Sequence, residues 1–217
     1  MNLILIAAPA AGKGTIASIL HEKYNLVCIS AGELLRGVDP DTELGKEIRE
    51  IQSRRELVDD RITNALMKEK LMNSDISNGF ILDGYPRRMA QVEAVNEMCE
   101  ELNLHIDKAI VLNVSYDCAL KRTLGREICP ECKKTYNSLT GVNAPKVPGM
   151  CDDCNVALTK RNDDNEETFK AGYKTFNENC PAVIEYYRNK GILLEVDAEG
   201  TPEETLAQIE NAIGSNK

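Results

Sequence analysis

The sequence contains no tryptophan, only two histidines and three phenylalanines, and no long apolar run. Without a stretch of about 20 apolar residues, it offers no candidate for a membrane-spanning helix. The two histidines, His21 and His105, belong to no catalytic pattern. No basic segment precedes the first apolar residues, so we expect no signal peptide and a cytosolic protein.

A surplus of basic residues is also missing, because 35 acidic residues stand against 26 basic ones and the net charge is −9. Duplex nucleic acid is bound through a basic footprint and is therefore not expected as the main partner. A small anion held by a few cations remains compatible with this charge. The 217 residues, 42% of them hydrophobic, indicate one packed domain with room for inserted lobes.

Short apolar runs alternate with helical patterns along the chain. Near-continuous hydrophobicity is typical of parallel strands that are covered on both faces. We expect strands at residues 3–6, 27–29, 80–82, 109–112 and 192–194. We expect helices at residues 16–24, 89–102 and 206–213, and a long polar one from about 162 to 190, bent near Pro181 and closed by Gly191. This alternation predicts an α/β fold, a doubly wound parallel sheet of five strands.

Residues 127–160 do not fit this pattern, because they contain three prolines and two glycines and show no sustained period. So long an irregular segment inside a compact domain is usually functional. We interpret it as a small lobe.

The segment Ala7-x4-Gly12-Lys13 has the spacing of a phosphate-binding loop but lacks its first glycine. An apolar strand precedes it and an amphipathic helix follows, so that a helix N-terminus would face the phosphates. Alanine at positive φ costs roughly 1 kcal/mol or more relative to glycine. We therefore expect negative φ at Ala7 and Ala10. The alternative is a plain strand–turn–helix joint with a solvated lysine.

Three further motifs follow this loop: ISAGELLR at residues 29–36, GFILDGYPR at 79–87 and RNDD at 161–164. Together with the loop, and in this order, they resemble the nucleoside monophosphate kinases, most closely the adenylate kinases of the long-lid bacterial type. The resemblance runs nearly end to end and implies a P-loop NTPase core with two mobile lobes. It places the core at residues 1–29, 60–121 and 161–217, the NMP-binding lobe at 30–59 and the lid at 122–160.

The resemblance also implies transfer of a phosphoryl group from ATP to AMP, with Mg²⁺ bound to ATP. Positioning and concentrated positive charge carry such a reaction. The implied catalytic residues are Lys13, Asp83, Arg87, Arg122, Arg126 and Arg161. The implied ATP-binding residues are Ala10, Ala11, Gly12, Lys13, Gly14, Thr15, Arg126, Thr135, Tyr136 and Gly200. The implied AMP-binding residues are Ala31, Arg36, Glu56, Leu57, Val58, Gly84, Tyr85, Arg87, Gln91 and Arg161.

The identity of the acceptor base depends on two positions. Gln91 stands where adenylate kinases read adenine, and an amide can donate and accept at once. Ala31, however, replaces a threonine of that family, and UMP/CMP kinases share this variant segment. Asp83 also has an alternative interpretation without a catalytic role, because Asp-Gly after a strand is a common turn. We favour AMP as the acceptor, with a CMP/UMP kinase as the alternative.

Cys129-x2-Cys132 and Cys151-x2-Cys154 form two C-x-x-C pairs within the lobe. Four thiolates at this spacing can hold one structural Zn²⁺, which a lobe too small for its own core would need. Two disulfides are the alternative. The resembling kinases include members with such a cysteine lid.

Gly172 departs from the family, which has an arginine there that points into the site. Eleven residues separate it from Arg161, about three helical turns, so the two share a face. The chain is therefore either a kinase with one cation fewer or a weakly active nucleotide-binding relative. A different class, a P-loop switch with a zinc ribbon, leaves Arg36, Arg87 and Gln91 without a role. We expect a monomer whose partners are ATP and AMP, without nucleic acid or membrane.

Overall fold

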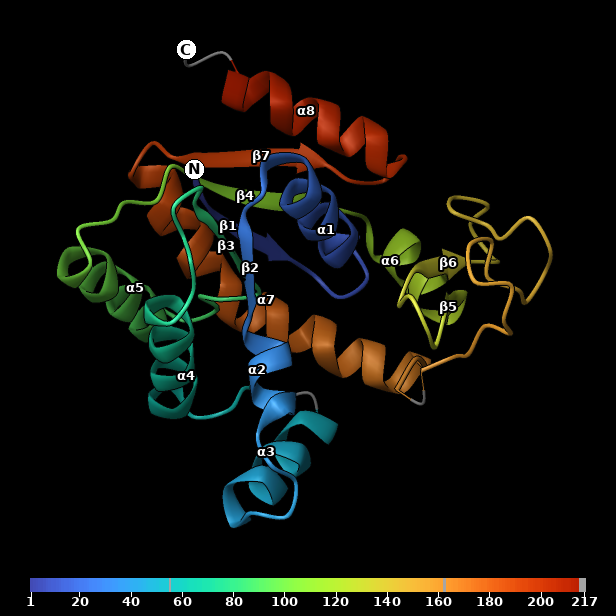
Figure 1. Cartoon of the computed structure of the whole chain (residues 1–217), viewed down its shortest axis with the longest axis horizontal. Helices are drawn as coiled ribbons and strands as arrows, with labels where there is room; N and C mark the ends of the chain where they lie inside the picture. Colours follow the sequence, from blue (N-terminus) through green and yellow to red (C-terminus); the bar gives the residue numbers. More distant parts are fainter. Residues whose placement is uncertain (55, 162, 215–217) are drawn as a thin grey trace.

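The computed structural model describes residues 1–54, 56–161 and 163–214. Its centre is a five-stranded sheet in the order β2-β3-β1-β4-β7 (Figure 1). All neighbouring strands of this sheet are parallel. The strands are β1 (Asn2–Ala7), β2 (Val27–Ser30), β3 (Phe80–Asp83), β4 (Lys108–Asn113) and β7 (Leu193–Asp197). The predicted fold class and all five strands are confirmed.

Helices cover both faces of the sheet, because the strand side chains alternate between two apolar clusters. Ile4 and Ile6 pack with α4 (Asp60–Met72), α5 (Met89–Glu101) and α7 (Glu166–Asn189) on one face. Leu3 and Leu5 pack with α1 (Lys13–Tyr24) and α8 (Pro202–Gly214) on the other. The central strands β1, β3 and β4 are therefore buried on both sides, which explains their near-continuous apolar sequences, whereas the edge strands β2 and β7 are less buried. None of the described helices is long and apolar enough to span a membrane.

The long helix α7 begins at Glu166 rather than near residue 162, and Asn162 itself lies outside the described residues. Asn165 caps the helix, since its side chain accepts a hydrogen bond from the amide of Thr168 at 2.9 Å. Two glutamates follow in the first turn, where the helix dipole favours negative charge. The helix continues through Pro181, and Gly191 follows its end with φ of 72°, as expected for a helix stop.

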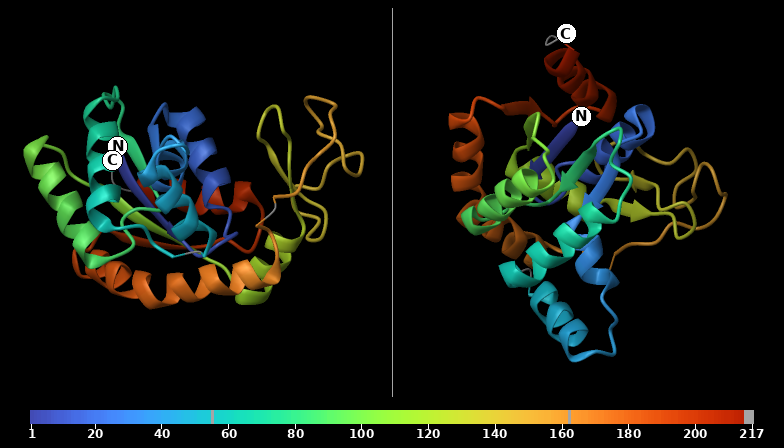
Figure 2. Two further views of the ribbon diagram at one scale, coloured as in Figure 1. Left: turned by 90° about the horizontal axis from the view of Figure 1, so that it is seen from below. Right: turned by 60° about the vertical axis from the view of Figure 1, so that its left-hand side comes forward.

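Two smaller units project from this core (Figures 1 and 2). In the first, α2 (Ala31–Gly37) and α3 (Glu43–Ser53) enclose an apolar cluster of Leu35, Ile48 and Val58. The second follows α6 (Tyr116–Leu124) and contains the antiparallel pair β5 (Arg126–Ile128) and β6 (Thr135–Asn137). Figure 2 shows α7 running along the core to the base of this second unit.

Candidate active site

A cleft with a volume of about 1260 Å³ lies where the core meets both smaller units. It opens beside the carboxyl end of β1, between β3 and β4, where doubly wound sheets bind their ligands. With one exception, the residues that the sequence predicts for ATP, AMP and catalysis line this cleft. Segments far apart in the chain therefore meet in one place.

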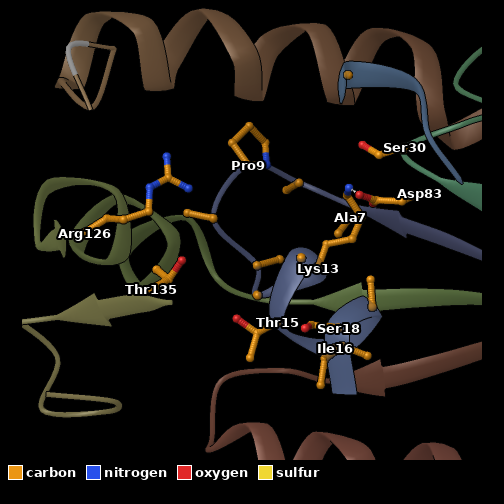
Figure 3. A pocket seen from close by; sticks show the side chains of 18 of the residues that line it. Ala7, Pro9, Lys13, Thr15, Ile16, Ser18, Ser30, Asp83, Arg126 and Thr135 are labelled. Atoms are coloured by element: carbon orange, nitrogen blue, oxygen red, sulfur yellow. Dashed lines mark hydrogen bonds and ion pairs between the residues drawn. The ribbon is translucent and has the colours of Figure 1, made fainter. Parts of the chain in front are cut away.

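The phosphate loop joins β1 to α1 and lies in the cleft (Figure 3). The amide of Ala11 closes a tight turn on the carbonyl oxygen of Ala8 at 3.3 Å. Gly12 precedes the helix with φ of 87°, and no acidic residue lies in the first turn of α1. Unpaired amides and the helix dipole thus face a space that suits an anion.

Our expectation of negative φ at both loop alanines is wrong for Ala10, which has φ of 60°. Ala7 ends β1 and has no positive φ, so the first missing glycine is tolerated. At Ala10 the Cβ must be accommodated in the left-handed region at a cost of about 1 kcal/mol. The loop geometry prevails over the intrinsic preference of the residue.

Lys13 reaches from the start of α1 to the carboxylate of Asp83 at the end of β3 (Figure 3). Gly84 follows with φ of 69°, and a Cβ there would lie 3.0 Å from Arg87 Nη2 and 3.3 Å from Lys13 Nζ. Arg87 is also tied to this turn, because its Nε donates to the carbonyl oxygen of Gly84 at 2.9 Å. The glycine thus lets two cations and one carboxylate crowd around a single turn.

The three arginines predicted to reach ATP from the lid side bind protein groups here. Arg126 forms a two-pronged ion pair with Asp164, and its Nε lies 2.8 Å from Oδ2. Arg122 donates to the carbonyl oxygens of residues 198–200 at 2.7 to 3.1 Å. Arg161 Nε lies 3.3 Å from the carboxylate of Asp163. All three line the cleft while they hold these protein partners.

The acceptor side of the cleft is built from α2, the segment before α4, and the turn that leads to α5. Ala31, Arg36, Glu56, Leu57 and Val58 line it. The Arg36 guanidinium folds back over Gly32, where a Cβ would lie 3.2 Å from Nη1. Gln91, from the first turn of α5, forms part of the wall and is only 3% exposed.

Tyr85 is the exception, because it does not line the cleft. Its side chain is buried in the core, where its hydroxyl donates to Asn64 Oδ1 at 2.7 Å. Burial raises the pKa of this phenol above its ordinary value. Sequence reasoning also missed Thr63 and Phe176, which line the cleft but belong to no recognised motif, and Ser30, which lies within the motif at residues 29–36 but was given no role.

Gly172 lies on the side of α7 that faces the phosphate loop, and it lines the cleft. A Cβ at this position would lie 3.2 Å from Cγ of Pro9 in the loop. The neighbouring cations Lys170 and Lys174 pair with Glu166 and Glu178 on their own helix. The helix and the loop are thus in close contact at Gly172.

Cys129, Cys132, Cys151 and Cys154 gather at the second small unit, with their sulfur atoms within 4.8 Å of one another. All eight cysteines are free, so the two disulfides considered as an alternative are not formed. Tyr136 forms a 3.4 Å hydrogen bond with Cys151, which lowers the pKa of that thiol to about 6. A thiolate is the form that binds metal, so this donor set fits a tetrahedral ion such as Zn²⁺.

Comparison with known proteins agrees with this geometry. Residues 5–192 match the family model described as adenylate kinase. The chain is 39% identical to the adenylate kinase of Fervidobacterium nodosum over 99% of this chain and 98% of that protein. It is 41% identical to that of Thermodesulfovibrio yellowstonii, over 96% and 97% of the two chains. It is 42% identical to the adenylate kinase of Archaeoglobus fulgidus, over 97% of this chain and 96% of that protein.

Proposed function

We propose, since this chain belongs to the adenylate kinase family, that it transfers the γ-phosphoryl group of ATP reversibly to AMP and forms two ADP. An oxygen of the AMP phosphate bonds to the γ-phosphorus while the bond to the β,γ-bridging oxygen breaks. The observation that carries this proposal is that one cleft is lined by both the phosphate loop with Lys13 and the acceptor-side arginines, Arg36 and Arg87.

On the donor side, the phosphates of ATP would lie against the amides of residues 10–15 at the start of α1. Lys13 would then turn toward a phosphate oxygen, because the phosphates of ATP carry more negative charge than the single carboxylate that it binds here. That change of partner frees Asp83, while Thr15 lies nearby in the same cleft. The family uses Mg²⁺ with ATP, and these two oxygen-bearing residues would hold it. The ion supplies positive charge for the phosphates.

On the acceptor side, Arg36 and Arg87 would bind the AMP phosphate through their planar guanidinium groups. Gln91 would read the base, in the wall formed with Leu57 and Val58. Arg122, Arg126 and Arg161 would leave their present protein partners and reach the phosphates when the lid closes. Each contact places charge where the transferred group needs it, which is the main requirement of phosphoryl transfer.

The division into a core and two moving lobes is part of the same proposal, with the NMP-binding lobe at 30–59 and the lid at 122–160. Its support is that the lid has an apolar cluster of its own, and that Leu35, Ile48 and Val58 form a second cluster, against which Ile62 and Leu66 of α4 pack. We further propose a structural Zn²⁺ on the four lid cysteines, a cytosolic location and a monomeric state. Four protein ligands would leave the zinc no open position for substrate.

The test measures ADP formation from ATP and Mg²⁺, with and without AMP, and compares kcat/KM for AMP, CMP, UMP and GMP. We expect AMP-dependent ADP formation, with AMP the preferred acceptor. Lys13→Met should abolish it, whereas Lys23→Met, on the exposed end of the same helix, should not. Slow ATP hydrolysis without any effect of a monophosphate would refute the proposal. Preference for CMP or UMP would reassign the acceptor.

A further inference from the structure

The side-chain amide of Gln91 is held by two hydrogen bonds of opposite sense. Its Oε1 accepts from the backbone amide of Arg87 at 2.7 Å. Its Nε2 donates to Oδ1 of Asp60, at the start of α4, also at 2.7 Å. Because Gln91 is only 3% exposed, water offers little competition for these bonds. The amide therefore has both ends fixed.

These two partners allow only one orientation of the amide. If the amide turned over, its NH₂ group would face the N–H of Arg87. Its oxygen would face the carboxylate of Asp60, with two acceptors opposed and no proton between them. Such buried, unsatisfied polar groups are costly. The Asp60 carboxylate contributes most to this bias, because it adds repulsion to the loss of a hydrogen bond.

Asp60 is in turn held by Arg88, whose Nη1 lies 3.3 Å from the same Oδ1 atom. The other arm of Arg88 donates to the carbonyl oxygen of Leu57 at 3.2 Å. Leu57 lines the acceptor side of the cleft, whereas Asp60 and Arg88 lie behind that wall. Arg88 thus links the Asp60 carboxylate, which orients Gln91, to Leu57 in the cleft wall.

We propose that Asp60 and Arg88 are positioning residues that set the base selectivity of the acceptor site by fixing the Gln91 amide. This inference rests on the proposed function, in which Gln91 reads the base. The fixed amide has one N–H and one oxygen lone pair left. Adenine matches them, because its N1 accepts and its 6-amino group donates. Hypoxanthine, which has a 6-oxo group and a protonated N1, presents the reverse order.

The test compares kcat/KM for AMP and IMP with the full chain, since these acceptors differ only at the 6-position and the adjacent proton. In Asp60→Asn the side chain keeps its size but can donate as well as accept, so the turned-over amide of Gln91 loses only its bond with the backbone N–H of Arg87. We expect the AMP-to-IMP ratio to fall about tenfold, the value of one hydrogen bond. The change should reside in KM, with kcat nearly constant, because the base lies far from the transferred group.

Asp59→Asn is the matched control, because it makes the same substitution one residue away. Asp59 caps α4 and pairs with exposed Arg61, and asparagine caps equally well. The AMP-to-IMP ratio of kcat/KM in Asp59→Asn should stay within about twofold of the wild-type ratio, as expected for a residue that does not touch Gln91. Arg88→Met should shift the ratio in the same direction as Asp60→Asn, but less.

Equal ratios in wild type, Asp60→Asn and Arg88→Met would overturn the inference and leave the proposed function intact. A wild-type chain without AMP-dependent activity would overturn both. Damage to the fold alone would lower activity toward both acceptors together. A rise in activity toward IMP, relative to AMP, is therefore specific to the loss of orientation.

Discussion

At the scale of single residues, Ala10 occupies a backbone conformation that glycine adopts without strain, with φ of 60°. We predict that Ala10→Gly raises the free energy of unfolding by about 0.5–1 kcal/mol. Relief of the left-handed strain exceeds the greater flexibility of glycine in the unfolded chain. Urea denaturation measures the change. Ala8→Gly, at a neighbouring alanine without positive φ, should have the opposite sign. Equal effects at both positions would contradict the strain.

Gly172, in the first third of α7, lines the cleft without adding a cation to it. We predict that Gly172→Arg raises kcat/KM for AMP, by up to about a hundredfold if the new guanidinium stabilises the transition state. The new Cβ must displace Pro9 by a few tenths of an ångström, since it would lie 3.2 Å from Cγ. Gly172→Met has the same Cβ and a comparable length without charge. If both variants gave the same kcat/KM, the missing-cation account would fail.

The limits of sequence reasoning are clearest at individual residues. The loop, Lys13 and the cysteine pairs were predictable because each is a local pattern with a direct physical purpose. The conformation of Ala10 was not, because tertiary structure outweighed its preference. Asp60 and Arg88 were missed because their contacts with Gln91 and with each other depend on how α4 packs beside α5. No pattern of residue spacing in the sequence predicts how α4 packs beside α5.

At the scale of elements, the five strands of the main sheet were predicted from the sequence, but β5, β6, α2, α3, α4 and α6 were not. The central strands β1, β3 and β4 are buried on both faces and stand out by their apolar runs. Burial does not explain the missed helices, because α4 buries three residues, as the predicted α1 does, and the predicted α8 buries only two. A cap was available at α3 and α6, where Thr42 and Ser115 accept from backbone amides, as side-chain oxygens at helix starts do. The start of α7 was misplaced because the Asn165 cap was overlooked.

The lid offers a prediction about metal. Its small apolar cluster is made largely of the cysteines themselves, so the lid depends on the ion for its order. We predict about one Zn²⁺ per chain by elemental analysis of protein purified without chelator. Cys132→Ser should lose the ion, make the lid sensitive to proteolysis and lower kcat, while nucleotide still binds the core.

Cys118→Ser is the matched control for the lid, because Cys118 lies on α6 outside the cluster. It should keep the metal and the activity of wild type. Four reactive thiols in freshly purified wild-type lid, without metal, would contradict the structural-zinc proposal.

At the scale of the whole molecule, the lid arginines are held by Asp164, Asp163 and backbone carbonyls. Under the proposed function, these contacts must open at every turnover. Closure then excludes water that would otherwise accept the phosphoryl group. We predict that lobe motion limits kcat, as product release or lid opening does in many enzymes. Rapid-quench single turnovers should proceed several-fold faster than steady-state kcat. Equal rates would show that chemistry is limiting.

The position of β1 at the centre of the sheet bears on how the chain is made. β1 pairs with β3 at residues 80–83 and with β4 at residues 108–113, both synthesised long after it. β1, which carries the phosphate loop, therefore leaves the ribosome before either of its neighbours has been made. Its apolar side chains stay exposed until β3 and β4 have been synthesised. A nascent chain that ends before β3 contains the whole loop sequence without either of the strands that pair with β1.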